Sequence, residues 1–185
     1  MKKSILIFLA IVMVVGFSNK VMAQVSNTKA TETTAAGAVL ITAMGLVETA
    51  PMHFGSNVLT DALGGTVVLP SNSTTRTYTG GVAASAATPV ATNAAYTVTG
   101  TGLETYAVTL PATTTVTHTT VASGVYTMDI TLMTARFNGA GSDAITSALA
   151  ADGTDSFTLG GTLTVQANQV GGIYAGTFDV TIDYN

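Results

Sequence analysis

The chain contains no cysteine and no tryptophan, and only 9% of its 185 residues are charged. Without cysteine it can form no disulfide, thiol nucleophile, iron–sulfur cluster or thiolate zinc site. The shortage of charge goes with 47% hydrophobic residues, a combination that argues against disorder. These absences exclude several classes of enzyme and metalloprotein, and the length suits one domain of ordinary size.

The first 23 residues have the features of a secretory signal peptide. Two lysines precede an apolar run over residues 5–17, and the segment ends on the small residue Ala23. Because the run is too short to cross a bilayer comfortably, we expect cleavage after Ala23 and no permanent membrane span afterwards. The sequence therefore predicts residues 1–23 as a signal peptide.

Positive charge is scarce in the remaining chain, which begins at Gln24. Its only cations are Lys29, Arg76 and Arg136, against ten carboxylates. Proteins that bind nucleic acid or anionic lipid neutralise phosphate groups with clustered lysine and arginine. We therefore expect no nucleic-acid partner.

Threonine, by contrast, is abundant, with 35 residues spread along the chain after residue 23. Its β-branched side chain favours strands, and its hydroxyl is compatible with an exposed face. Four segments, 105–110, 126–132, 162–167 and 177–184, alternate apolar residues with mostly polar ones at a period of two. Each is expected to be a strand with one buried and one exposed face.

Turn signals separate these strands. Four Gly-Gly pairs, at 64–65, 80–81, 160–161 and 171–172, are expected to mark hairpin turns or strand entries. The run 142–153, which starts with Ser and Asp, could form one short helix or a loop that crosses between sheets. The pattern predicts an all-β fold, an immunoglobulin-like β-sandwich of about seven to nine strands.

No arrangement of residues indicates catalysis. His53 and His118 are far apart in the sequence and have no acidic partner at a spacing typical of metal ligands. Asp152 and Asp155 are weak calcium candidates, although their spacing does not match the twelve-residue calcium loop and a solvated turn explains them as well. A hydrolase that uses such carboxylates is a further alternative. We expect no enzyme, no cofactor and no other metal site.

Seven phrases, distributed over nearly the whole chain after the signal peptide, carry a resemblance. They are 52–55, 64–70, 76–82, 95–100, 105–111, 160–165 and 172–185. In their order and spacing they resemble the domain of unknown function 4402 family of exported bacterial proteins. The family has no established activity, so this resemblance implies architecture more than function.

The closing phrase, 172–185, is also similar to the last strand of chaperone–usher pilins and spore-coat-U-like subunits. Those proteins commonly end in Gly-x-Tyr, an alternating strand and a final Tyr. In such pilins the sandwich lacks one strand, and the N-terminal extension of a neighbouring subunit fills the groove. The similarity implies an incomplete sandwich completed by a donated strand. It also implies that copies of the chain or related subunits are partners, with a periplasmic chaperone as a further one.

The N-terminal region offers the candidate donor strand. Residues 24–37 are small, polar and nearly uncharged, whereas 38–47 are apolar on both faces. The donor is either 24–37 alone or includes 38–47, which could instead be the first strand of the domain; a tail without a role is the alternative for 24–37. We expect 24–37 to be an extended segment and 38–185 a β-sandwich. The expected assembly residues are Val39, Ile41, Ala43, Phe178, Val180, Ile182 and Tyr184.

The leading functional hypothesis is a non-enzymatic, exported structural subunit that assembles by strand donation, in the manner of a fimbria. It would pass the inner membrane and the periplasm and end at the cell surface or outside the cell. The alternative is a self-contained surface adhesion or carbohydrate-binding module, with a polar patch lined by Tyr78, Tyr96 or Tyr106.

Overall fold

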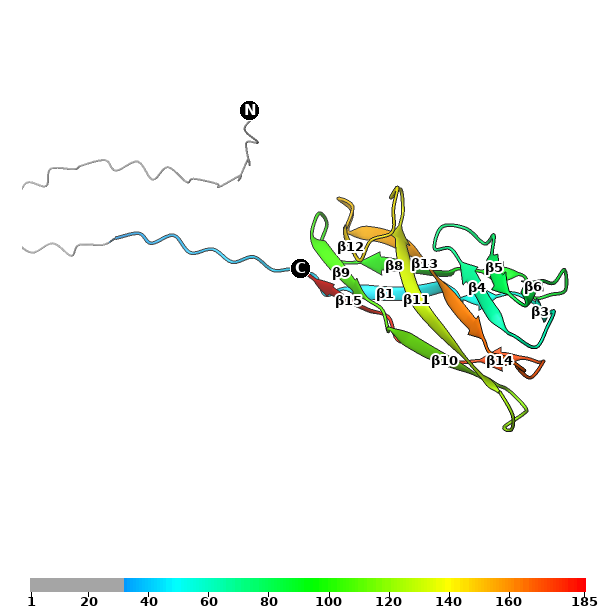
Figure 1. The fold of residues 1–185 in the computed structure, drawn as a ribbon. Helices are drawn as coiled ribbons and strands as arrows, with labels where there is room; N and C mark the ends of the chain where they lie inside the picture. The colour runs from blue at the N-terminus through cyan, green and yellow to red at the C-terminus, as the bar shows by residue number, and fades with distance from the viewer. Residues whose placement is uncertain (1–31) are drawn as a thin grey trace, which may run out of the picture. The chain divides into compact units, whose positions relative to one another are not determined.

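A computed structural model describes residues 32–185, so the expected signal peptide, residues 1–23, lies outside the described part. Val39–Asn185 form one compact unit, in which every regular element is a β-strand (Figure 1). Residues 32–185 accordingly include no helix of the length and hydrophobicity needed to cross a membrane. The prediction of an all-β fold is confirmed.

Nine strands have four or more residues, which agrees with the expected number. They are β1 (Gly45–Ala50), β4 (Gly65–Leu69), β5 (Thr77–Gly80), β8 (Ala94–Thr99), β9 (Thr105–Thr109), β10 (Thr113–His118), β11 (Thr127–Phe137), β13 (Thr154–Val165) and β15 (Thr181–Tyr184). The shorter pieces are β2 (His53–Phe54), β3 (Asn57–Leu59), β6 (Val82–Ala84), β7 (Ala91–Thr92), β12 (Thr146–Ala148) and β14 (Tyr174–Ala175).

The strands form two main antiparallel sheets. The larger sheet has the order β1-β8-β13-β11-β10-β14, and β4 and β5 branch from the second half of β13. The smaller sheet has the order β12-β9-β15. Apolar side chains from both sheets meet in a common core, as expected for a β-sandwich.

The period-two alternation correctly located most strands. Along β9, Tyr106 and Val108 are buried while Thr105 and Thr109 are exposed. The segment 177–184 is the partial exception, because only its second half, β15, is paired with a neighbouring strand.

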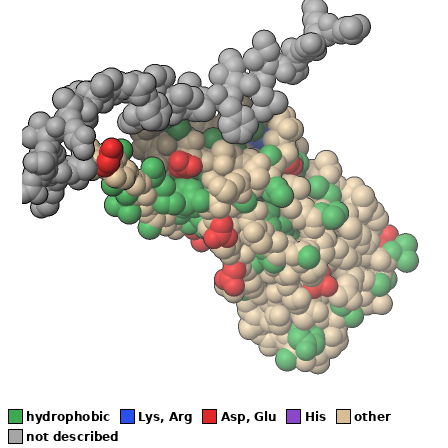
Figure 2. Space-filling model, turned by 90° about the vertical axis from the view of Figure 1, so that its left-hand side faces the viewer, with side chains coloured by type: hydrophobic (Ala, Val, Ile, Leu, Met, Phe, Trp, Pro, Cys, Tyr) green, Lys and Arg blue, Asp and Glu red, His purple; other side chains and the backbone are tan. Residues whose placement is uncertain are grey.

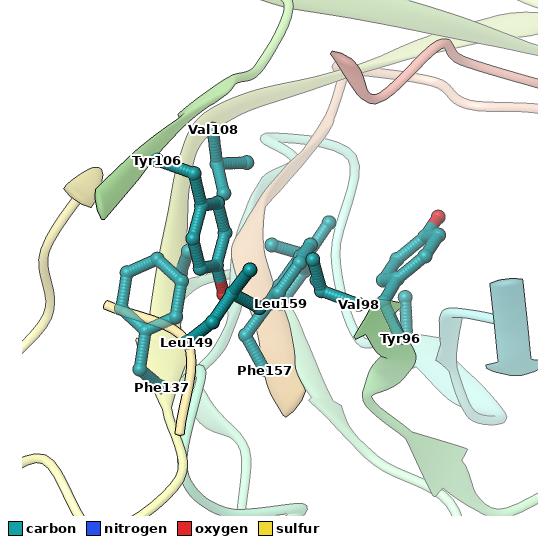
Figure 3. Packing of buried hydrophobic residues seen from close by; sticks show 10 residues of the cluster. Tyr96, Val98, Tyr106, Val108, Phe137, Leu149, Phe157 and Leu159 are labelled. Carbon is teal, nitrogen blue, oxygen red and sulfur yellow. The ribbon is translucent and has the colours of Figure 1, made fainter. Parts of the chain in front are cut away.

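The first core lies between β8, β9, β11 and β13. Tyr96 and Phe157 stack with ring centroids 5.1 Å apart, and Phe137 meets Tyr106 edge to face at 5.8 Å. Figure 3 shows these rings directed at one another around Leu159. A second core, at the start of β11 and the end of β13, contains Val67 and other side chains of the branch strands. The buried residues of this second core are Phe54, Val67, Leu69, Val82, Ala91, Met128, Ile130, Leu163 and Val165.

The expected turn at 160–161 is wrong, since both glycines lie inside the long strand β13. At this point β13 changes its neighbour from β8 to β4. A Cβ at Gly160 would overlap the carbonyl oxygen of Leu69 and the amide nitrogen of Ser71. Glycine is therefore needed here for close packing of two backbones rather than for a turn. The other three pairs lie at turns or strand entries.

The short helix considered for 142–153 is also wrong, because this run contains the edge strand β12. The amide of Leu149 donates to the carbonyl of Glu104, and the carbonyl of Ile145 accepts from the amide of Val108. These bonds to the β9 region replace the hydrogen bonds that a helix would make within itself. Leu149 is buried, whereas Ile145 is 66% exposed.

Candidate assembly site

Two edge strands, one from each main sheet, run along the same side of the first core. Within the described residues β1 pairs only with β8, and β15 pairs only with β9, so each strand has one unpaired edge. The segments 41–44 and 182–184 line a common groove of about 360 Å³. Figure 1 shows β15 ending beside the start of β1. We call the open strip between 41–46 and 178–184 the seam.

Apolar side chains along the seam are only partly covered. Phe178, Val180, Ile182 and Tyr184 pack against the first core from one side, and Met44 and Leu46 do so from the other. None of the six is buried. Residues of inner strands in the same core, such as Val98 and Leu159, are fully buried. The first core is thus less completely covered along the seam than at its inner strands.

A group of hydrogen bonds fixes the chain at the start of the domain. The amide of Thr42 donates to Oγ1 of Thr101 at 2.6 Å, and its carbonyl accepts from the hydroxyl of Tyr184 at 2.8 Å. The same hydroxyl accepts from the amide of Thr101 at 2.7 Å. We call this group the clasp. It ties residue 42 to both the C-terminal strand and the loop after β8.

The chain before the clasp carries exposed apolar side chains. Val39 and Leu40 are 92% and 96% exposed, and residues 32–44 contain no strand or helix. β1, which begins at Gly45, pairs with β8 as the first strand of the domain. The later part of 38–47 therefore belongs to the domain itself, and the apolar side chains that precede it are exposed.

The predicted assembly residues fall into three groups in the structure. Ile41 and Ala43 line the same groove as Ile182 and Tyr184. Phe178 and Val180 lie farther along the same side of the core. Val39 lies before the clasp and stands free of the domain's core. Sequence analysis missed Thr42 and Thr101, and no local pattern signals them because 59 positions separate the two.

The seam has acidic side chains near it. Glu48 of β1, Asp179 and Asp183 are all exposed. Burial and, to a smaller extent, the charge of Glu48 raise the pKa of Tyr96. Figure 2 shows hydrophobic side chains interspersed with acidic ones on the side that carries the C-terminus in Figure 1. A partner segment at the seam would thus meet an apolar strip and negative charge.

The candidate calcium ligands have hydrogen-bonding roles within the protein. Asp152 accepts from the amide and hydroxyl of Thr154 in the turn before β13. Asp155 accepts from the hydroxyls of Tyr106 and Ser147 at 2.9 and 2.7 Å. Within residues 32–185 no three side chains of His, Asp or Glu form a group that could hold a metal ion. The calcium site stays a prediction.

The histidines take part in loop structure. Nδ1 of His53 accepts from the amide of Gly55, and Nδ1 of His118 accepts from the amides of Thr120 and Val121. These contacts stabilise turns.

The two arginines that the structure describes bind groups of their own chain. Nη1 of Arg76 donates to the carbonyls of Phe54 and Ser56. Nε of Arg136 lies 2.7 Å from Oδ1 of Asp143. Both cations therefore contribute to local structure.

Of the three tyrosines named as candidates to line a polar patch, two are buried. Tyr106 is fully buried and Tyr96 is 8% exposed, because both point into the first core (Figure 3). Tyr78 is half-buried beneath the guanidinium of Arg76, which lies 5.6 Å from the ring centroid. A polar groove does exist elsewhere, and it is lined by Thr97, Asn138, Ser147, Ala148, Ala150, Thr154, Asp155 and Ser156.

Comparison with known families agrees with the resemblance seen in the sequence. The family model for a domain of unknown function, DUF4402, matches residues 41–184. The match starts one residue before the clasp and ends at Tyr184. No curated protein and no solved structure matches the chain.

Proposed function

Because the chain belongs to the DUF4402 family, whose function is unknown, we propose its function from the assembly site. It is a non-enzymatic, exported structural subunit that assembles by strand donation into a fimbria-like fibre at the cell surface. Its partners are copies of itself or related subunits, and a periplasmic chaperone covers the seam during transit. Residues 1–23 direct the export.

The open seam is the observation that carries this proposal. Unpaired strand edges and half-covered apolar side chains are liabilities in a soluble protein, because they invite pairing with another chain. Here both features coincide along β1 and β15, while exposed Val39 and Leu40 lie at the start of the compact unit, before the clasp. One subunit thus provides an acceptor edge and a donor segment of suitable chemistry.

A thermal melt of a fusion protein tests the proposal. A second copy of residues 32–41 is added after Asn185 through a flexible linker of about 15 residues, long enough for either strand direction. If the added copy fills the seam, the sandwich gains a strand within one chain. A net gain of about 2 kcal/mol would raise the melting temperature by about 4–8 °C, and higher oligomers would decrease.

The matched control is the same fusion with Val39, Leu40 and Ile41 of the added copy replaced by serine. It keeps the length and the backbone hydrogen-bonding groups but lacks the apolar side chains, so we expect little or no rise. Equal melting temperatures for the parent, the fusion and the control, all monomeric, would refute strand donation.

A self-contained carbohydrate-binding module is the second candidate, favoured by the polar groove at the β12 edge. The hydroxyl of Ser147 donates to the carboxylate of Asp155 there, and Thr154 also lines the groove. Saturable glycan binding by a monomer, abolished in Thr154→Val and unaffected in the Thr79→Val control on distant β5, would favour this module instead.

A further inference from the structure

The turn that follows β11 combines an asparagine and a glycine in an arrangement that favours a covalent change. We infer that Asn138 is a site of spontaneous deamidation, at which the side-chain amide is replaced by a carboxylate while the domain stays folded. The change adds a negative charge to the polar groove at the β12 edge. This inference is independent of the proposed assembly function.

Deamidation of an asparagine begins with an attack by the backbone nitrogen of the next residue. That nitrogen loses its proton and forms a bond to Cγ of the asparagine, and the Cγ–Nδ2 bond then breaks with release of ammonia. Water opens the resulting cyclic imide. Opening at Cγ gives aspartate, whereas opening at the main-chain carbonyl gives isoaspartate, whose backbone runs through Cγ. Glycine as the next residue favours the attack, because it has no Cβ to obstruct ring closure.

The turn presents such a pair at the surface. Asn138-Gly139 is the only Asn-Gly pair in the chain, and both residues are exposed. The turn is closed by the amide of Ala140, which donates to the carbonyl of Phe137 at 3.0 Å. Gly139 has a φ of +74°, and a Cβ added there would meet no atom within 4 Å. Neighbouring atoms therefore leave room for the cyclic imide on the glycine side of the turn.

The hydrogen bonds of the turn leave both reacting groups free. The amide of Asn138 donates to the carbonyl of Ser156 at 2.9 Å, which fixes the turn to the end of the β11–β13 ladder. Among residues 32–185, however, no partner in the protein binds the amide of Gly139 or the side chain of Asn138. The attacking nitrogen and Cγ can thus approach each other without breaking a hydrogen bond of the fold.

A second pair in the chain has related chemistry but a different environment. Asp152-Gly153 is the only Asp-Gly pair, and an aspartate can form the same imide with release of water. Here Gly153 is buried, and its amide donates to the carbonyl of Ala150 at 2.9 Å. Oδ1 of Asp152 accepts from the amide and the hydroxyl of Thr154. The fold therefore protects this pair, whereas it leaves the pair after β11 exposed.

Deamidation would change the charge of the polar groove. Asn138 lines this groove, and Asp155 is the only carboxylate among the other residues that line it. A carboxylate at position 138 would place a second negative charge there, which repels anionic ligands and attracts cationic ones. Isoaspartate would also lengthen the main chain by one carbon atom beside Phe137, a residue of the first core. The turn is thus a slow and irreversible switch of the charge in the groove.

A comparison of the folded and the unfolded chain tests the inference. Purified protein is incubated at about pH 8 and 37 °C with and without denaturant, digested with pepsin and analysed by peptide mass spectrometry. Isoaspartate from Asp152 has the mass of aspartate and is identified by its separate chromatographic elution. We expect Asn138 to deamidate in the folded protein within about threefold of its rate in the unfolded chain, and Asp152 to isomerise at least tenfold more slowly when folded. Greater protection of Asn138 would overturn the inference, and equal rates for Asp152 in the two states would refute its explanation by hydrogen bonding.

Asn138→Gln is the matched control, because glutamine keeps the amide but would need a larger ring. Isoelectric focusing of the folded parent should show an acidic species that accumulates with time, focuses close to Asn138→Asp and is absent from Asn138→Gln. An acidic species that forms equally fast in Asn138→Gln would overturn Asn138 as the site.

Discussion

Replacing Tyr106 with Phe tests the hydrogen bond that joins the two sheets at the base of the first core. Tyr106 of β9 belongs to the smaller sheet, and its hydroxyl donates at 2.9 Å to Asp155 of β13 in the larger sheet. Phe keeps the buried ring and its edge-to-face contact with Phe137 but removes the hydroxyl. The substitution thus isolates one polar contact between sheets.

The expected loss of stability follows from what Asp155 retains. A hydrogen bond to a charged group contributes about 1.5–3 kcal/mol. Because the carboxylate still accepts from the hydroxyl of Ser147 and the amide of Ser156, the loss should be near 1.5 kcal/mol. That corresponds to a decrease in melting temperature of about 3–6 °C, measurable by circular dichroism at pH 7.

A pH series adds a second, independent signature. Burial first, and then the bond to Asp155, raises the pKa of Tyr106 above the ordinary value of 10.0. Because the native state holds this proton more tightly than the unfolded chain, the contribution is complete below pH 10 and is lost as the pH rises further. The difference between parent and Tyr106→Phe should therefore narrow above pH 10, by up to about 1.4 kcal/mol per pH unit. Tyr126→Phe is the control, since no hydrogen bond of its hydroxyl occurs within the described residues. Equal melting temperatures at pH 7, or a difference unchanged between pH 9 and 11, would refute this account.

Three further substitutions examine other features. Gly160→Ala should lower the melting temperature by at least 5 °C, because the new Cβ would overlap backbone atoms. Gly161→Ala should lower it far less, because its Cβ would approach no atom closer than the side chain of Ile130 at 3.3 Å; similar losses would contradict the close-packing explanation. Burial opposes ionisation of Asp143, but hydrogen bonds from Ser71 and Arg136 lower its pKa. The parent should therefore lose stability as the pH falls below about 4, and Asp143→Asn should lose less; melting temperatures of the two proteins that fall in parallel from pH 7 to pH 2 would contradict this. Leu40→Asp should leave the melting temperature of the monomer within about 1–2 °C of the parent value, because the side chain is exposed. It should shift the species seen in sedimentation from oligomer to monomer, and unchanged oligomers would exclude this side chain from the interface.

The sequence was most informative where a strand has one buried and one exposed face. In β9 and in the first half of β11, each inward position is apolar and each outward one is Thr, Ala or Asp, so alternation alone located the strands. It failed at 142–153, where apolar residues are also compatible with helical spacing. There the decisive contacts are hydrogen bonds to a strand about 40 positions earlier, which no local pattern contains.

Local patterns indicate which residues line the seam, whereas the contacts between them depend on distant pairing. The alternation of 178–184 and the apolar run before residue 47 mark side chains that lie on its two sides, and their role in assembly stays a prediction. The position at which the chain becomes bonded to its own domain could not be found in this way. It is marked by the clasp, which brings Thr42, Thr101 and Tyr184 together from three separate regions of the chain. Similarly, Tyr106 reads as an ordinary strand tyrosine until its burial and its partner Asp155 are known.

The placement of the two arginines has a consequence for proteolysis. After Lys29 the chain offers a trypsin-like protease only Arg76 and Arg136, because such enzymes require a basic side chain in a specificity pocket. Arg76 is bonded to backbone beside Phe54 of the second core, and Arg136 lies between two residues of the first core and is paired with Asp143. Neither side chain can enter a protease until its surroundings open. We therefore expect the folded domain to resist tryptic digestion, and we expect cleavage after Arg76 or after Arg136 to report which of its two cores opens first.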